Sequence, residues 1–272
     1  MAKTPEHIKW LSNTGNFLKT SDGRDIEIWV LNHKADDKIL SAWARHFRRH
    51  YCLDTEIDIL RDGTGLSRRD YLLSIVFPDS RTPPGPSLRS GDFAEILIAD
   101  YLEFMLSFWV PRQRYDSKNI RNESTKGSDV IGFKFAAVDD SPDDILVIYE
   151  AKAKLSGTKC INRLQKAVND SEKDYHLRKA ESLNALKRRF VRNEDTASAN
   201  KIKRFQNKSD RPYIELSGAA AIFSTATYDR NIIQETDVSS HPNVPNLKLI
   251  VIKGDDMMTL AHGLYRRAAD EA

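Results

Sequence analysis

The most constraining feature of this 272-residue chain is an apolar run at 145–149 (ILVIY) that leads directly into Glu150 and Lys152. An apolar run without polar alternation predicts a strand that is buried on both faces, as in the centre of a sheet covered by helices. Side chains alternate along a strand, so Glu150 and Lys152 should project from the same face, about 7 Å apart. Because an isolated buried charge is costly, these two charges at the end of a core strand need partners.

Hydrophobic periodicity predicts the elements on either side of this strand. The predicted strands cover residues 25–31, 129–135, 145–152, 218–223 and 247–252, and the predicted helices cover 35–50, 67–77, 92–108, 160–208 and 255–268. Alternating strands and helices predict an α/β domain with a mixed central sheet flanked by helices. The stretch 80–91, with three prolines and two glycines, is interpreted as the boundary between a small N-terminal α+β region, residues 1–88, and a main domain, residues 89–272. We expect the N-terminal region to bind a partner.

Charge is distributed unevenly along the chain. The net charge is +3, whereas residues 159–208 contain fourteen Lys or Arg against six Asp or Glu, a local excess of +8. Such a segment is either a solvated helical surface or a surface for nucleic-acid phosphates, and both interpretations stay open. The candidate phosphate contacts in this segment and near the strand end are Lys126, Lys154, Arg188, Arg189, Arg192, Lys203 and Arg204.

Cysteine content and hydropathy indicate the cellular compartment in which the protein is expected. The chain has only two cysteines, Cys52 and Cys160, which form neither a disulfide framework nor a zinc-ligand pattern. No apolar run approaches the ~20 residues needed to cross a bilayer, and the first residues lack the apolar core of a signal peptide. We therefore expect a soluble, cytoplasmic protein without a membrane partner.

Two further carboxylates are candidates to complete a site around Glu150 and Lys152. Asp129 begins the preceding predicted strand, so it can reach the same cation as Glu150 if the two strands are neighbours. Glu95 shares a helical stripe with apolar residues three, four and seven positions later, which predicts that it faces inward. Mg²⁺ or Mn²⁺ prefers carboxylate oxygens, and Lys152 could stabilise the charge that grows on a phosphate. This set predicts a metal-dependent phosphodiesterase.

Each of these residues also has a purely structural interpretation. Asp92 and Glu95 have the spacing of a helix N-cap and its reciprocal acid, and Asp129 could cap the turn that enters its strand. Glu150 and Lys152 could form a solvated ion pair worth ~0–1 kcal/mol. The apolar run before Glu150 argues against full exposure, and the combination of residues favours a site. The histidines, including His46 and His50, are interpreted as core or surface residues.

The order helix-Glu95, strand-Asp129 and strand Glu150-x-Lys152 resembles the PD-(D/E)xK nuclease superfamily. The segments GDFAE, KGSDVIG and YEAK are similar to the HamA family, the nuclease subunits of Hachiman anti-phage systems, over residues 91–268. The resemblance implies a restriction-endonuclease-like core in which Asp129, Glu150 and Lys152 are catalytic and Glu95 is supportive. It implies that Asp129, Glu150 and Glu95 bind Mg²⁺. It also implies DNA as the target, a helicase subunit as the partner and a role in antiviral defence.

Two positions depart from the superfamily pattern. Ser128 stands where a proline would precede the Asp, and Asn169 stands where some branches have a tyrosine four residues after Gln165. The second departure argues against close kinship with RecB-like exonucleases. Three functions are compatible with the sequence. They are a metal-dependent DNA nuclease that works with a helicase, a non-catalytic nuclease-fold adaptor that binds DNA or the helicase, and a stand-alone restriction-type endonuclease.

Overall fold

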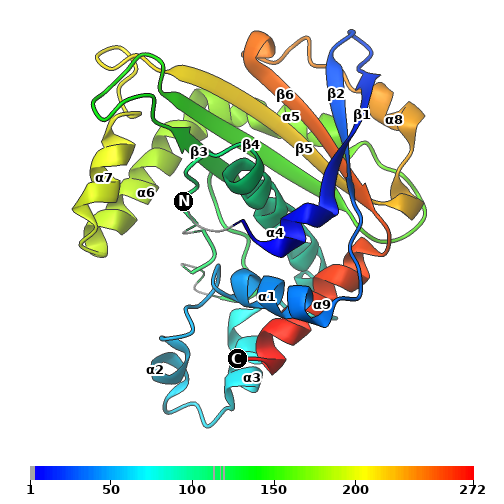
Figure 1. Ribbon diagram of the computed structural model, residues 1–272, viewed down its shortest axis with the longest axis vertical. Coiled ribbons are helices and arrows are strands. Elements are labelled where there is room, and N and C mark those ends of the chain that lie inside the picture. Colours follow the sequence, from blue (N-terminus) through cyan, green and yellow to red (C-terminus); the bar gives the residue numbers. More distant parts are fainter. Residues whose placement is uncertain (1–3, 113, 117, 119) are drawn as a thin grey trace.

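The computed structural model describes residues 4–112, 114–116, 118 and 120–272, and its centre is a six-stranded sheet (Figure 1). In spatial order the strands are β1 (Leu11–Lys19), β2 (Asp25–Leu31), β6 (Leu247–Gly254), β5 (Ile214–Ser224), β4 (Ile145–Lys154) and β3 (Val130–Lys134). The four strands from β2 to β4 are parallel, whereas β1 and β3 at the edges run antiparallel to their neighbours. The mixed, helix-flanked sheet confirms the predicted α/β class and is consistent with a restriction-endonuclease-like core.

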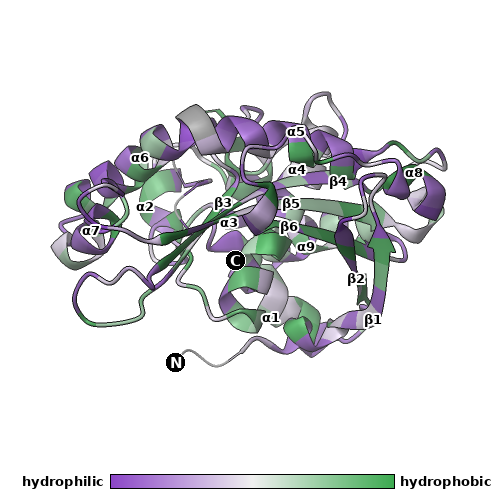
Figure 2. Ribbon diagram, turned by 90° about the horizontal axis from the view of Figure 1, so that it is seen from above, coloured by the Kyte–Doolittle hydropathy of each residue, from purple (hydrophilic) through white to green (hydrophobic). Residues whose placement is uncertain are grey.

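Helices cover both faces of the sheet. One face packs against α1 (Asp37–Arg48), α4 (Gly85–Asp100) and α9 (Met257–Asp270). The other packs against α5 (Arg163–Lys173), α6 (Lys179–Arg192) and α7 (Thr196–Lys203). Figure 2 views the sheet along its edge, with α5 and α6 on one side and α1 and α9 on the other. Three short helices complete the set, namely α2 (Ile57–Arg61), α3 (Arg68–Tyr71) and α8 (Arg230–Gln234).

Strand β4 is buried on both faces, as its apolar sequence predicts. Val147 and Tyr149 belong to the core beneath α4 and α9. Leu146 and Ile148 belong to the core beneath α6 and α7. Because side chains alternate along a strand, Glu150, Lys152 and Lys154 continue on the same side as Leu146 and Ile148. The carboxyl end of β4 therefore presents its charges towards the α5–α6 layer.

The predicted boundary between residues 1–88 and residues 89–272 does not separate two structural units. β2 pairs with β6 in the same sheet, and Trp43 of α1 shares a core with Phe93 and Tyr265. The boundary falls inside α4, which begins at Gly85 and not at Asp92. Prolines are favoured in the first turn of a helix, where no backbone donor is lost, so the proline-rich stretch starts α4. The N-cap role for Asp92 is therefore wrong.

Other elements differ from the prediction at their ends. β1 was not predicted, because its sequence is largely polar and six of its residues in succession are exposed. The predicted helix 67–77 is α3 followed by a π-helical turn (Leu72–Val76), and α4 likewise ends in a π-helical turn (Tyr101–Met105). Among the described residues, no helix is both long enough and apolar enough to cross a membrane.

Candidate active site

Asp129, Glu150 and Lys152 lie together at the ends of two neighbouring strands. β3 and β4 are paired with Val130 opposite Tyr149, so the next step of the register sets Asp129 beside Glu150. Lys152 Nζ contacts Glu150 Oε1 and lies 4.0 Å from Asp129 Oδ2. The structure thus brings the three predicted residues to one face of the sheet.

The Asp129 carboxylate is held by the neighbouring strand and by an arginine. The backbone N–H of Ala151 donates to Asp129 Oδ2 at 3.1 Å, and Arg114 donates to Oδ1 at 2.8 Å. Neither contact belongs to the turn that precedes β3, so Asp129 does not act as the turn cap considered from the sequence. Its orientation is fixed by β4 and Arg114.

Ser128 makes a contact that a proline at this position could not make. Its backbone N–H donates to Ser182 Oγ at 3.0 Å, and its hydroxyl donates to Asp174 Oδ1 at 2.9 Å. Proline has no N–H and could not make the first bond. Gly127, immediately before it, has a φ of +95°, a conformation that glycine adopts without strain. The turn that delivers Asp129 is therefore anchored to α6 and to the end of α5.

Glu150 is a buried carboxylate with an unsatisfied oxygen. Its side chain is 3% exposed, and its Oε2 accepts no hydrogen bond from a described N–H or O–H donor, although Arg178 lies 3.6 Å away and the carboxyl of Asp174 adjoins it. Burial, and then the negative charge of Asp129, raise the pKa of Glu150 to about 9. A divalent cation would relieve both effects, because it would add its positive charge to that of Lys152 and Arg178 beside the ionised carboxylate. One or two carboxylates are sufficient protein ligands for Mg²⁺, so Asp129 and Glu150 fit this ion.

Glu95 reaches the same site through Arg114. Its Oε2 accepts hydrogen bonds from the Tyr115 hydroxyl at 2.5 Å and is 2.8 Å from Nε of Arg114, which also binds Asp129. Burial raises the pKa of Glu95 to about 8 even though Arg114 opposes the shift. Glu95 is therefore inward-facing, as predicted, but Arg114 stands between it and Asp129. This contact suits a supporting residue better than a direct metal ligand.

Besides Arg114, three charged residues of the site were not predicted from the sequence. Asp170 on α5 lies 3.2 Å from Lys152 Nζ. Arg178 approaches both Glu150 and Asp174, each at 3.6 Å. Asp170, Asp174 and Arg178 are spaced four residues apart, which places them on one helical face. That spacing, on the segment after the Glu-x-Lys strand, is the signal from which they could have been found.

Except for the buried Asp174, these charged residues of the site line an open groove with a volume of about 860 Å³. Of the predicted phosphate contacts, Lys126 and Lys154 line the groove itself. Arg189 lines an adjoining pocket of about 290 Å³ that shares Asp129 with the groove. Arg188, Arg192 and Lys203 are exposed on α6 and α7 and line neither space.

Comparison with protein families identifies the chain. A family model named HamA matches residues 5–268 of the 272. The chain belongs to the HamA family. This assigns it to the Hachiman anti-phage defence system. The match begins at residue 5, so this HamA chain carries its N-terminal strands and α1 as part of the family domain, in agreement with the continuous sheet. No curated protein matches the chain.

In this HamA chain Arg204 is a structural residue, which corrects its assignment as a phosphate contact. Its guanidinium donates to Asp144 Oδ2 at 2.9 Å through Nε and to the carbonyl of Val138 at 3.0 Å. Asp144 is buried and also accepts the backbone N–H of Ala136. The positive charge of Arg204 is therefore used to close the loop between β3 and β4.

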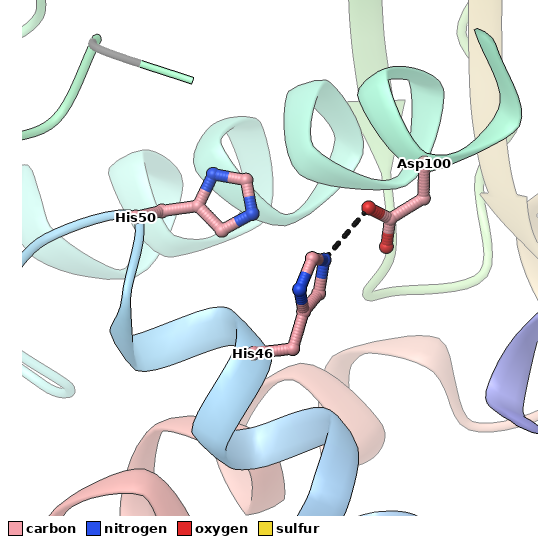
Figure 3. Close-up of side chains that lie close together, drawn as sticks. All are labelled: His46, His50 and Asp100. Atoms are coloured by element: carbon pink, nitrogen blue, oxygen red, sulfur yellow. Dashed lines mark hydrogen bonds and ion pairs between the residues drawn. The ribbon is translucent and has the colours of Figure 1, made fainter. Parts of the chain in front are cut away.

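A second group of potential ligands in the HamA chain lies away from the groove. The side chains of His46, His50 and Asp100 offer ligand atoms within 4.8 Å of one another (Figure 3). Arg112 already supplies a cation there, 2.6 Å from Asp100 and 2.9 Å from His50 Nε2. Burial and Arg112 lower the pKa of His50, so this ring is neutral. We interpret the group as a hydrogen-bonded cluster that joins α1 to α4.

Proposed function

We propose that this HamA protein is a Mg²⁺- or Mn²⁺-dependent nuclease that hydrolyses DNA. The observation that carries the proposal is the buried Glu150, whose Oε2 accepts no hydrogen bond although Asp129 and Lys152 stand beside it. Asp129 and Glu150 would hold the divalent cation. When bound there, the cation would neutralise the negative charge that develops on the scissile phosphate.

Lys152 is suited to stabilise charge and not to accept a proton. Burial disfavours its positive charge, but Asp129 and Glu150 outweigh burial and raise the pKa of Lys152. The ammonium is therefore charged at neutral pH. Glu150 and Asp170 hold it at the groove, where it would bind the phosphate oxygens as their negative charge grows. Arg114, clamped between Glu95 and Asp129, keeps the Asp129 carboxylate oriented.

The effector role and the helicase partner are part of the same proposal. They rest on membership in the HamA family and on the resemblance of GDFAE, KGSDVIG and YEAK to nuclease subunits. A protein of this kind would be delivered to DNA, or held inactive, by the helicase.

Digestion of linear single- and double-stranded DNA tests the proposal. We expect cutting with Mg²⁺ or Mn²⁺ that EDTA abolishes, and its loss in Asp129→Asn and Glu150→Gln. Lys152→Met should reduce the rate by roughly 10²–10³-fold, as for the loss of one charge-stabilising donor. Glu181→Gln is a matched control, because Glu181 is an exposed acid that lines the same groove.

A non-catalytic adaptor is the competing function, and one observation favours it. Lys152, Arg114 and Arg178 already pair with the carboxylates, so the charges are partly balanced without a metal ion. The adaptor predicts no cutting with either metal, with or without the helicase. Full activity in Glu150→Gln would equally exclude the active site proposed here.

A further inference from the structure

The cations that line the groove fall into two sets. Three are ion-paired with carboxylates of the site: Arg114, Lys152 and Arg178. Three have no ion pair and no side-chain hydrogen bond to any described residue: Lys126, Lys154 and Arg163. The first set balances the charge of the protein's own acids. The second set is available to a ligand that carries negative charge.

Arg163 is the most informative member of the second set. It is the first residue of α5, on the segment that follows β4, and its side chain is half-buried against the groove. Its Nε is buried and has no hydrogen-bond partner among the described residues. A buried donor without an acceptor destabilises a fold, so the packing of α5 does not account for this guanidinium. A hydrogen-bond acceptor on a ligand in the groove would account for it.

We propose that Arg163 binds a backbone phosphate of DNA beside Glu150 and Lys152, and that Lys154 makes a second contact. This inference rests on the proposed function, because it assumes that the groove receives DNA. A guanidinium presents a planar fork of donors that matches two phosphate oxygens. Lys154 follows Glu150 and Lys152 on the same side of β4, and Arg163 lines the same groove, so both cations share the groove with the carboxylates that would hold the metal ion.

Binding measured without cutting tests the proposal. We would place each substitution in a Glu150→Gln background and titrate a fluorescent DNA oligonucleotide at several salt concentrations. Arg163→Ala should raise Kd roughly tenfold or more, as expected for one charge-assisted bidentate contact. It should also lower the slope of log K against log salt by about one, because one phosphate contact is lost. Arg163→Lys should keep the slope but bind more weakly.

Lys166→Ala is the matched control. Lys166 is an exposed cation one helical turn later on α5, and it does not line the groove. It should leave Kd and the salt slope unchanged. An unchanged Kd and slope in Arg163→Ala would overturn the proposal, as would an equal loss in Lys166→Ala. Because Nε has no partner in the fold, Arg163→Ala should melt at the same temperature as the parent; a lower melting temperature would assign Arg163 a structural role instead.

The outcome is separable from that of the proposed function. If the unmodified protein cuts DNA while Arg163→Ala binds as tightly as the parent, the nuclease assignment stands and the Arg163 contact fails. If binding depends on Arg163 but the unmodified protein never cuts, the contact stands and the adaptor function replaces the nuclease.

Discussion

Glu150 combines the location of a core residue with the chemistry of a ligand. It lies within β4, directly after the apolar run 145–149, and the cores on both faces of β4 continue up to its position. A residue chosen for stability alone would be apolar there, since a buried ionised carboxylate is costly. The retained carboxylate, with an oxygen that accepts no hydrogen bond, is what favours a cation-binding role for this position.

The raised pKa of Glu150 predicts how stability depends on pH when divalent cations are removed. In the unfolded chain Glu150 ionises near its ordinary pKa of 4.5, whereas in the folded protein its pKa is about 9. The folded state therefore holds the proton over this interval. The stability that Glu150 contributes is therefore fully present below pH 4.5 and is lost as the pH rises towards about 9. We expect thermal melting in EDTA to show this fall, and Glu150→Gln to reduce it.

Glu95, whose pKa is raised to about 8, should account for the pH dependence of stability that remains in Glu150→Gln. The exposed Glu181→Gln serves as control and should retain the full slope. Identical pH profiles for the parent and Glu150→Gln would contradict the assignment of the proton to Glu150.

Ser128→Pro would place the namesake proline of the PD-(D/E)xK nucleases before Asp129 and should nevertheless slow the proposed cutting reaction. The substitution removes the backbone N–H that binds Ser182 and so releases the turn before Asp129. We expect the cutting rate to fall by about tenfold or more, the effect of a misplaced catalytic group. Ser128→Ala keeps the N–H and should remain much more active. Equal rates for the proline and alanine variants would show that the N–H has no part in placing Asp129.

At the scale of elements, β4 depends on its neighbour β5 as much as on its own sequence. The ring of Tyr149 lies directly over Gly218, and a Cβ at Gly218 would come within 2.5 Å of that ring. The glycine on β5 therefore lets β4, the strand that carries Glu150 and Lys152, accommodate a large aromatic side chain. Tyr149 in turn belongs to the core beneath α4 and immediately precedes Glu150.

Gly218→Ala should accordingly destabilise the protein by about 1–3 kcal/mol, the usual cost of overpacking a core. Gly263→Ala on α9 is the matched control. No atom lies within 4 Å of its added Cβ, and alanine is favoured in a helix by about 0.8–1.0 kcal/mol over glycine. Urea unfolding should show opposite signs for the two variants. A neutral Gly218→Ala would mean that the Tyr149 ring moves aside freely.

The strength of the local pattern decides which elements can be predicted from the sequence. β2, β4 and β6 are predictable because burial on both faces requires apolar runs. β1 is not predictable, because its exposed, polar sequence lacks the hydrophobic pattern of a strand and its structure depends on pairing with β2. The start of α4 is misplaced because prolines both end and begin helices.

The same distinction applies to the site. Glu150 and Lys152 are predictable because they alternate on one strand, and Asp129 follows if β3 and β4 are neighbours. Arg114 reaches the site from a loop whose position only the tertiary structure defines, whereas Asp170 has a signal in its four-residue spacing with Asp174 and Arg178. The structural task of Arg204 is hidden for the same reason, because Asp144 lies 60 positions away in the chain.

At the scale of the whole molecule, a buried polar cluster joins the N-terminal residues to the rest. Asp100 on α4 is fully buried and binds His7 at 3.0 Å, His46 at 2.9 Å and Arg112 at 2.6 Å. Burial opposes the charge of Asp100, but Arg112 and His46 hold its pKa well below the ordinary value. The ring of His7 also stacks on Trp43 at 4.4 Å. The first fifty residues are thus tied to α4 by charge as well as by packing.

Asp100→Ala should therefore cost about 3–5 kcal/mol, because it leaves Arg112 as a buried charge without its partner. Asp37→Ala offers a comparison, since Asp37 pairs with Arg267 while 87% exposed and such pairs contribute about 0–1 kcal/mol.

Denaturation followed by tryptophan fluorescence and by circular dichroism should give coincident curves for the parent, as one continuous core requires. Two separate transitions would show that residues 1–88 fold independently.

The placement of Glu150 and Lys152 on a doubly covered strand limits how the protein can be switched off. Loops can swing away and return, but β4 has no such freedom, because the helical layers on both sides are packed onto it. Its charged end is consequently always formed whenever the chain is folded. If the proposed nuclease is inhibited in the cell, we expect the inhibitor to block access to the groove, because packing fixes Glu150 and Lys152 beneath it.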